Sequence, residues 1–472
     1  MKPGLLALLN IFTQGILVYF LLVNAVYILF VVMSAFGILR HLRWTRFLQT
    51  QEIFSSPMAK PISIIAPAFN EEAGIVESVR SLLSLEYPQF EVIVVNDGST
   101  DTTLARLVET FSLKPVRRIY RKVLECKPIR GIYTSPEYHQ LVLVDKVNGH
   151  GKADALNAGL NIARYPLFCA IDGHSLLDRD SLLRIVRPFL EDPERVMAVG
   201  GVIRLSNGCL VRYGQTVECP RLPKNNLARY QILEYFRAFL GGRMGMSMLR
   251  SMIIVSGAFG IFRKDIALAC GGYNPKAIGE DLDLVVRIRR HCYRKKIPHR
   301  IVFVPDPICW TQAPERWRVL ARQRGRWQRG LLQTFHFYGR MVFNPRYGLV
   351  GMFALPFYLV FELLGPIIEI LGYLTFVLLI FWHKVDYPFA FLFFTVSVVL
   401  GTLLSISSIF LGELSSKRYP RFRDIFILGA YSVLENLYYR QFLSLVRAKA
   451  FLEYFRGRNV WGAMEKKGFE RT

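Results

Sequence analysis

The segment Phe168-Cys169-Ala170-Ile171-Asp172-Gly173-His174-Ser175 is a short apolar run that ends abruptly in polar residues. This pattern is typical of a buried parallel strand whose carboxyl end opens into a crevice, where open α/β sheets bind ligands. Side chains alternate along a strand, so Asp172 and His174 can face one ion. A carboxylate and an imidazole suit Mn²⁺ or another divalent metal that holds a diphosphate. Taken alone, the segment is better explained by a strand-end aspartate, Asp172, in a turn with Gly173.

The apolar run of this segment is the predicted strand Leu167–Ile171. Three other β-branched runs predict more strands of the same sheet: Pro61–Phe69, Phe90–Val95 and Leu141–Val144. Helical segments alternate with these runs, so we expect a doubly wound, mostly parallel α/β sheet. Polar residues follow each run. Because the carboxyl ends of parallel strands meet at one edge, these residues should converge on one crevice. The basic stretch Pro115–Glu137 is predicted to be a surface excursion.

Two loops add candidate site residues. The glycines of Asn148–Gly159 allow a ligand to approach the backbone, and Lys152 places a positive charge at a helix start. The alternative is an ordinary turn with an exposed lysine. Glu280, Asp281 and Asp283 open another helix. Acidic residues there commonly complement the helix dipole, which suffices for Glu280 and Asp283 but less well for Asp281.

The stretch Arg316–Arg340 is basic and aromatic. On a helix, one side carries Arg318, Arg322, Arg326 and Arg329, and an adjacent side carries Gln323 and Trp327. A basic amphipathic helix on the membrane surface explains the arginines. It does not explain Gln323 and Trp327.

Apolar segments near both ends predict a multi-pass membrane protein. Gly15–Leu39 carries no charge, exceeds the ~20 residues that cross a bilayer, and is followed by basic residues that favour a cytoplasmic flank. A cleaved signal peptide would have a shorter core preceded by its basic residues. Leu349–His383 is one kinked span or a tight pair, and Phe389–Leu411 is a clean span. Ile425–Leu445 is interfacial or packed inside the bundle, so three spans fit the charge rule best and five are the alternative.

These segments divide the chain into regions. We expect a first membrane segment over 1–46, a cytoplasmic α/β domain over 47–310, interface helices over 311–347, membrane or interfacial helices over 348–445 and a basic cytoplasmic tail over 446–472. The net charge of +24 has no accompanying nucleic-acid motif and fits contact with anionic lipid and a polyanionic substrate. The seven cysteines lack zinc-site spacing and are expected to be reduced.

Five motifs occur in a fixed order: PAFNEE from Pro67, VNDGS from Val95, IDGHS from Ile171, GED from Gly279 and QRGRW from Gln323. Together they resemble the membrane-embedded family 2 glycosyltransferases, which include the cellulose, hyaluronan and poly-N-acetylglucosamine synthases. The resemblance spans nearly the whole chain and implies a GT-A fold and inverting transfer from a UDP-sugar, with Mn²⁺ or Mg²⁺ at Asp172.

The resemblance also implies roles for single residues. Asp281 would be the general base, with Glu280 beside it, and Asp172 would reach the diphosphate and its metal together with Lys152. The remaining substrate-binding residues would be Pro67, Phe69, Asn70, Glu71 and Asp97 around the uracil, and Gln323, Arg326 and Trp327 at the diphosphate and the acceptor sugar.

One departure from the family pattern concerns the metal site. The family usually has Asp-x-Asp where this chain has Asp172-Gly173-His174. Imidazole binds Mn²⁺, so we expect either a changed metal preference or a different donor or acceptor.

The interpretation that we prefer is a polysaccharide synthase in the plasma or inner membrane that also translocates its product. Its partners would be a UDP-sugar, a glycan acceptor, anionic lipid and accessory secretion subunits. The alternatives are a transferase that adds one sugar to a lipid-linked acceptor, and a nucleotide-sugar-binding scaffold impaired by His174.

Overall fold

A ten-stranded sheet forms the α/β part of the computed structural model, which describes residues 3–47, 59–212, 214–216, 222–415 and 421–457. The strand order is β3-β4-β5-β2-β1-β6-β11-β8-β12-β7. Their bounds are Ile62–Ala68 (β1), Phe90–Asn96 (β2), Lys114–Pro115 (β3), Ile129–Thr134 (β4), Leu141–Lys146 (β5), Leu167–Ile171 (β6), Leu176–Leu177 (β7), Val196–Leu205 (β8), Phe259–Arg263 (β11) and Arg300–Thr311 (β12).

Parallel pairing joins the run β5-β2-β1-β6, in which the four predicted strands lie side by side, and also joins β8 to β12. The sheet as a whole is mixed, because β11 is antiparallel to both β6 and β8, and β4 is antiparallel to β5. The segment between β8 and β11 leaves the carboxyl end of β8 and returns to the same edge, so β11 must run the opposite way. The predicted surface excursion contains β4, which extends the sheet.

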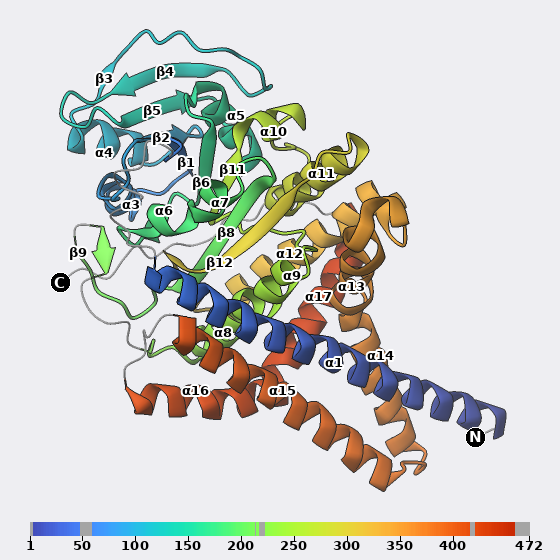
Figure 1. Ribbon diagram of the computed structural model, residues 1–472. Coiled ribbons are helices and arrows are strands. Elements are labelled where there is room, and N and C mark those ends of the chain that lie inside the picture. The colour runs from blue at the N-terminus through green and yellow to red at the C-terminus, as the bar shows by residue number, and fades with distance from the viewer. Residues whose placement is uncertain (1–2, 48–58, 213, 217–221, 416–420, 458–472) are drawn as a thin grey trace.

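Helices flank this sheet and connect its strands (Figure 1). They are Ile75–Leu83 (α3), Thr103–Thr110 (α4), Lys152–Ile162 (α5), Ser181–Ile185 (α6), Arg187–Glu191 (α7), Lys264–Ala269 (α10) and Glu280–Arg294 (α11). β5, β6 and β8 are buried along their whole length, as continuous apolar strands of a covered sheet require.

The segment between β8 and β11 carries three consecutive helices: α8 (Asn226–Phe236), the π-helix η1 (Arg237–Arg243) and α9 (Met244–Met248). They pack against α1 (Pro3–Phe47) and α15 (Tyr387–Ser415). The largest core cluster therefore contains Phe30 and Ile38 of α1 together with the strand residues. The sheet and the apolar helices share one core.

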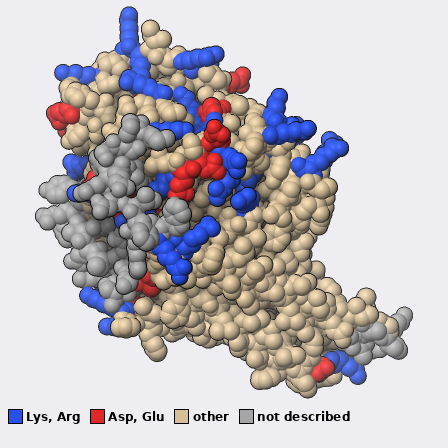
Figure 2. Space-filling model, viewed as in Figure 1, with Lys and Arg blue, Asp and Glu red and all other residues tan. Residues whose placement is uncertain are grey.

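Within the described part of the chain, three helices are long and apolar enough to cross a membrane: Ile11–Arg43, Val350–Phe381 and Tyr387–Ser415. Their ribbons project together from the α/β part (Figure 1), and the protruding surface in Figure 2 is almost free of charged side chains until its far end. The second span is one kinked helical run that ends in α14 (Gly365–Phe381), with Pro366 in its first turn.

The basic stretch 316–340 and the segment 425–445 were predicted to lie at the membrane surface or inside the bundle, and the structure packs their helices together. α12 (Trp317–Tyr338) lies against α17 (Arg440–Phe455), and Arg329 of α12 forms an ion pair with Glu453 at 2.7 Å. α17 also contacts α14, and α16 (Phe422–Leu434), which begins the predicted segment 425–445, packs against α15 and α8, so this part of the chain is packed in the bundle. None of the six cysteines that the structure describes forms a disulfide, as expected for reduced thiols; Cys219 lies outside the described residues.

The orientation of the α/β part can be checked with two engineered cysteines. Glu109 is exposed on α4, and Lys384 is exposed in the turn between α14 and α15. If the α/β part is cytoplasmic, a membrane-impermeant maleimide added to sealed cells should label Lys384→Cys but label Glu109→Cys only after lysis. Wild type gives the background, and the reverse pattern would contradict this topology.

Candidate active site

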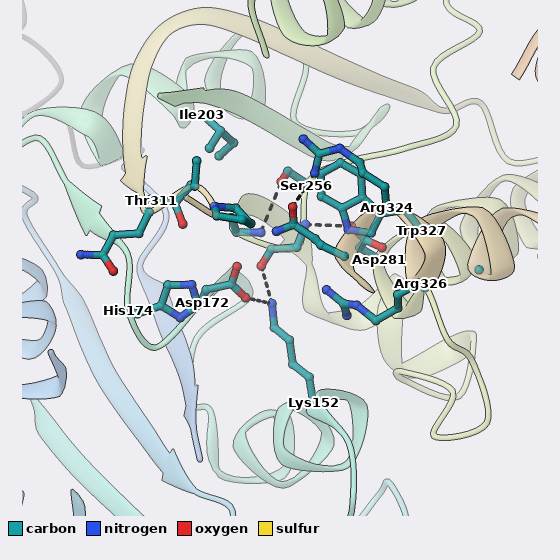
Figure 3. A pocket seen from close by; sticks show the side chains of 18 of the residues that line it. Lys152, Asp172, His174, Ile203, Ser256, Asp281, Thr311, Arg324, Arg326 and Trp327 are labelled. Atoms are coloured by element: carbon teal, nitrogen blue, oxygen red, sulfur yellow. Dashed lines mark hydrogen bonds and ion pairs between the residues drawn. The ribbon is translucent and has the colours of Figure 1, made fainter. Parts of the chain in front are cut away.

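A cavity of about 1110 Å³ lies at the carboxyl edge of the parallel strands. The strand ends, the start of α5, the start of α11 and one side of α12 all contribute to it (Figure 3). All the residues predicted from the sequence line this cavity: Pro67, Phe69, Asn70, Glu71, Asp97, Lys152, Asp172, His174, Glu280, Asp281, Gln323, Arg326 and Trp327. The prediction that the polar residues after the strands converge on one crevice is therefore confirmed.

Lys152 joins the two sides of this cavity. Its ammonium group bonds the Asp172 carboxylate and, at 2.6 Å, the carbonyl oxygen of Gly257. The Gly257 N–H donates to Asp281 Oδ2 at 3.0 Å. A Cβ on Gly257 would lie 3.2 Å from Lys152 Nζ, so the position favours glycine. Burial acts to raise the pKa of Asp172, but the charge and hydrogen bond of Lys152, together with His174 and Arg326, outweigh it and lower that pKa below the usual aspartate value.

His174 lies beside Asp172, with Nδ1 3.3 Å from Glu71 Oε1. Burial lowers the pKa of His174, so the imidazole is neutral at neutral pH and its Nε2 faces away from Glu71. Within the described residues, no group of three or more His, Cys, Asp or Glu side chains is placed to hold a metal. Asp172 and His174 supply two donors, which suits an ion that takes its other ligands from phosphate oxygens and water.

The three acidic residues at the start of α11, Glu280, Asp281 and Asp283, lie in different environments. Asp281 accepts hydrogen bonds from Gly257 and from the N–H of Leu282, at 2.8 Å. Burial and the neighbouring Asp281 raise the pKa of Glu280. Asp283 is held by Arg287 at 2.8 Å and Tyr338 at 2.7 Å, as a helix-start residue with a structural role would be.

Two arginines of the QRGRW motif have different surroundings. Arg326 lines the cavity and lowers the pKa of Asp172 through its charge, so it lies on the same side as Lys152. Arg324 is buried, forms a two-point ion pair with Glu234 at 2.8 and 2.9 Å, and donates to Gln323. Its guanidinium carbon lies 4.2 Å from the centre of the Trp327 ring. Arg324 therefore fixes Gln323 and Trp327.

The cavity is also lined by helices of the bundle, namely α8, η1, α17 and the π-helix η5 (Tyr358–Leu363). The residues of this inner part are Tyr235, Phe239, Arg243, Tyr358, Glu362 and Arg447. Arg447 and Glu362 form an ion pair at 3.1 Å. Sequence reasoning did not assign these residues to the site, since they come from segments whose patterns predict only helices. Glu362 carried a signal as a charged residue within an apolar run. Arg324, which sequence reasoning also missed, carried one through its place within QRGRW.

Two sequence profiles of one family match the chain consecutively. "Glycosyl transferase family 2" matches residues 63–124, and "Glycosyltransferase like family 2" matches residues 126–330. These ranges contain the sheet and every cavity residue from Pro67 to Trp327. The chain belongs to the family 2 glycosyltransferases and has the GT-A fold.

Curated relatives include the poly-beta-1,6-N-acetyl-D-glucosamine synthases of Staphylococcus epidermidis and Staphylococcus aureus. They are 27% and 26% identical over 269 residues, which is 57% of this chain and 54% of each relative. The match thus spans about half the length of these relatives. Among solved structures, the mannosyltransferase PcManGT from Pyrobaculum calidifontis in complex with GDP-Man and Mn²⁺ has a TM-score of 0.48 and 20% identity, covering 88% of this chain and 99% of that chain.

The different surroundings of Arg324 and Arg326 predict different mutant behaviour. Arg324→Met removes the two-point ion pair to Glu234, which is partly exposed and keeps the hydrogen bond from Tyr439, so it should cost roughly 1.5–3 kcal/mol of stability. Arg326→Met should lower the activity of the purified protein and shift its melting temperature less, because Arg326 is only half-buried and lines the cavity. Melting curves in detergent test both, and Glu234→Gln combined with Arg324→Met should recover part of the loss. Equal melting temperatures for Arg324→Met and wild type would contradict the structural role.

Proposed function

We propose that this chain transfers a sugar from a UDP-sugar, with inversion, to the end of a growing polysaccharide and passes the product into the membrane. The observation that carries the proposal is one continuous cavity. It holds the Lys152–Asp172 pair and Asp281 at its centre, Trp327 beyond them, and then runs between helices that include a candidate span.

The donor would lie across the strand ends, with its base beside Asp97 and its diphosphate between Lys152 and Arg326. These two cations would stabilise the charge that develops on the leaving diphosphate. A divalent cation, Mn²⁺ or Mg²⁺, held by Asp172 and His174 would neutralise part of the same charge when bound. An imidazole beside a carboxylate favours Mn²⁺ over Mg²⁺, because Mg²⁺ prefers oxygen ligands.

The acceptor would approach from the inner part of the cavity. Trp327 lines the cavity and is 45% exposed, so the ring face that Arg324 does not cover is available to a sugar. Asp281 would take the proton of the attacking hydroxyl, which approaches the anomeric carbon from the side opposite the diphosphate and inverts it. The raised pKa of Glu280 favours its neutral form beside the Asp281 carboxylate.

The names of the staphylococcal relatives favour N-acetylglucosamine as the transferred sugar. The proposed topology places the α/β region, 47–310, in the cytoplasm, where nucleotide sugars are available, and places basic residues of 311–347 and 446–472 near anionic lipid. The test is to incubate the purified protein with a panel of UDP-sugars and Mn²⁺ or Mg²⁺, and to measure UDP release and product size. Single-sugar products would favour transfer to a lipid-linked acceptor, and no UDP release with any sugar would favour a scaffold.

Asp281→Asn tests the proposed base. Asparagine keeps the shape of the side chain but cannot accept the proton, so turnover should fall roughly 10²–10⁴-fold while UDP binding stays near the wild-type value. UDP-release assays and nucleotide titrations measure the two quantities. Asp283→Asn, which changes a neighbouring carboxylate outside the cavity, is the matched control. Wild-type turnover in Asp281→Asn would remove Asp281 from the mechanism.

His174 variants test the metal site. His174→Ala should weaken Mn²⁺ binding in the presence of UDP, because one of two protein donors is lost. His174→Asp should restore an oxygen donor and shift the preference toward Mg²⁺. Calorimetric titration of each ion into the UDP-bound protein measures the affinities. Equal Mn²⁺ affinities for wild type and His174→Ala would leave His174 no role as a ligand.

A further inference from the structure

Lys146 is the last residue of β5 and is fully buried. It lies next to Asp97, at the end of the cavity where the nucleobase of the donor would bind. Its ammonium group bonds the Asp97 carboxylate, Asp154 Oδ2 at 2.6 Å and the carbonyl oxygen of Val147 at 2.6 Å. These three acceptors use all three N–H donors of an ammonium group. Lys146 does not line the cavity, whereas Asp97 does, so any effect of Lys146 on a ligand must act through Asp97.

The contacts of Asp97 fix the direction of its carboxylate. Oδ1 accepts from Lys146 and from the N–H of Gly149 at 2.9 Å. Oδ2 is therefore the oxygen left for a ligand in the cavity. A carboxylate paired with an ammonium group only accepts hydrogen bonds. The N3 position of uracil carries a hydrogen and can donate to such an oxygen, whereas N3 of cytosine is itself an acceptor and would face it unpaired.

The same lysine anchors the loop that follows β5. Asp154, its second partner, accepts the N–H of Lys127 at 3.0 Å, and a Cβ on Gly149 would lie only 2.4 Å from Asp154 Oδ2. The loop thus closes tightly over the Lys146–Asp154 pair. Its geometry holds the Gly149 N–H against Asp97, so the lysine fixes Asp97 both directly and through the loop.

We propose that Lys146 is a positioning residue for nucleobase recognition, which holds Asp97 so that the site binds uridine in preference to cytidine nucleotides. This inference rests on the proposed function, in which Asp97 meets the base of the donor. The competing explanation is that Lys146 only neutralises two buried carboxylates. That purely structural role would change stability but not the ratio of UDP to CDP affinity.

The experiment measures UDP, CDP and pyrophosphate binding to the full-length protein in detergent with Mn²⁺ present. Lys146→Met alone would leave two buried carboxylates facing each other, so it is combined with Asp154→Asn, and Asp154→Asn alone is the matched control. We expect the control to keep the wild-type UDP/CDP ratio. In the double variant this ratio should fall about 10-fold or more, the range of a hydrogen bond to a charged group. Pyrophosphate affinity, which does not involve the base, should stay unchanged.

An unchanged UDP/CDP ratio in the folded double variant would overturn the role of Lys146. If that variant does not fold, the double variant Lys146→Gln with Asp154→Asn replaces it. A wild-type ratio of UDP to CDP affinity in this second double variant would also overturn the role. Failure of the proposed function is a separate result. Wild type without preference for UDP, or Asp97→Asn with the wild-type ratio, would show that Asp97 does not read the base at all.

Discussion

The ammonium group of Lys152 determines the geometry of the cavity, because it bonds both Asp172 at the end of β6 and the backbone of Gly257 before β11. Gly257 in turn bonds Asp281 at the start of α11. One mostly buried cation, Lys152, thus connects the proposed diphosphate side with the proposed base. Separating a buried charge from its partner is costly, so the three segments are held in a fixed relation before any ligand arrives.

The π-helix η1 is the second element that holds the cavity in place, because side chains at its start bond the apolar helices. Arg237 at its start bonds Glu435, a fully buried carboxylate, and Ser405 of α15. Arg243 at its end lines the cavity with its guanidinium 3.9 Å from the Phe239 ring centre. π-Helices often occur at functional sites, and here one turn of irregular helix links the cavity to the helix bundle.

The sequence was sufficient to predict the parallel strands from local rules, and the cavity residues from those rules together with the ordered family motifs. A buried strand that meets a crevice ends in polar residues, and Asp172 was found in this way, whereas Asp281 was noted at a helix start and its role came from the family resemblance. The direction of β11 could not be predicted, since it depends on the path of the chain between β8 and β11. The distinction between Arg324 and Arg326 was also hidden, because it depends on Glu234, a partner 90 residues away in sequence. Lys146 escaped notice because the predicted strand ended at Val144, two residues before it.

The shared core of sheet and helices has a consequence for biosynthesis. Phe30 of α1, the strand residues, Ile409 of α15 and Leu428 of α16 (Phe422–Leu434) belong to one buried cluster. A ribosome makes α1 first and α15 and α16 more than 300 residues later. The α/β part therefore emerges before its core is complete, and part of its apolar surface stays open until α15 and α16 have packed against it. Folding of the catalytic part is completed only with the packing of these C-terminal helices, which ties the appearance of activity to completion of the helix bundle.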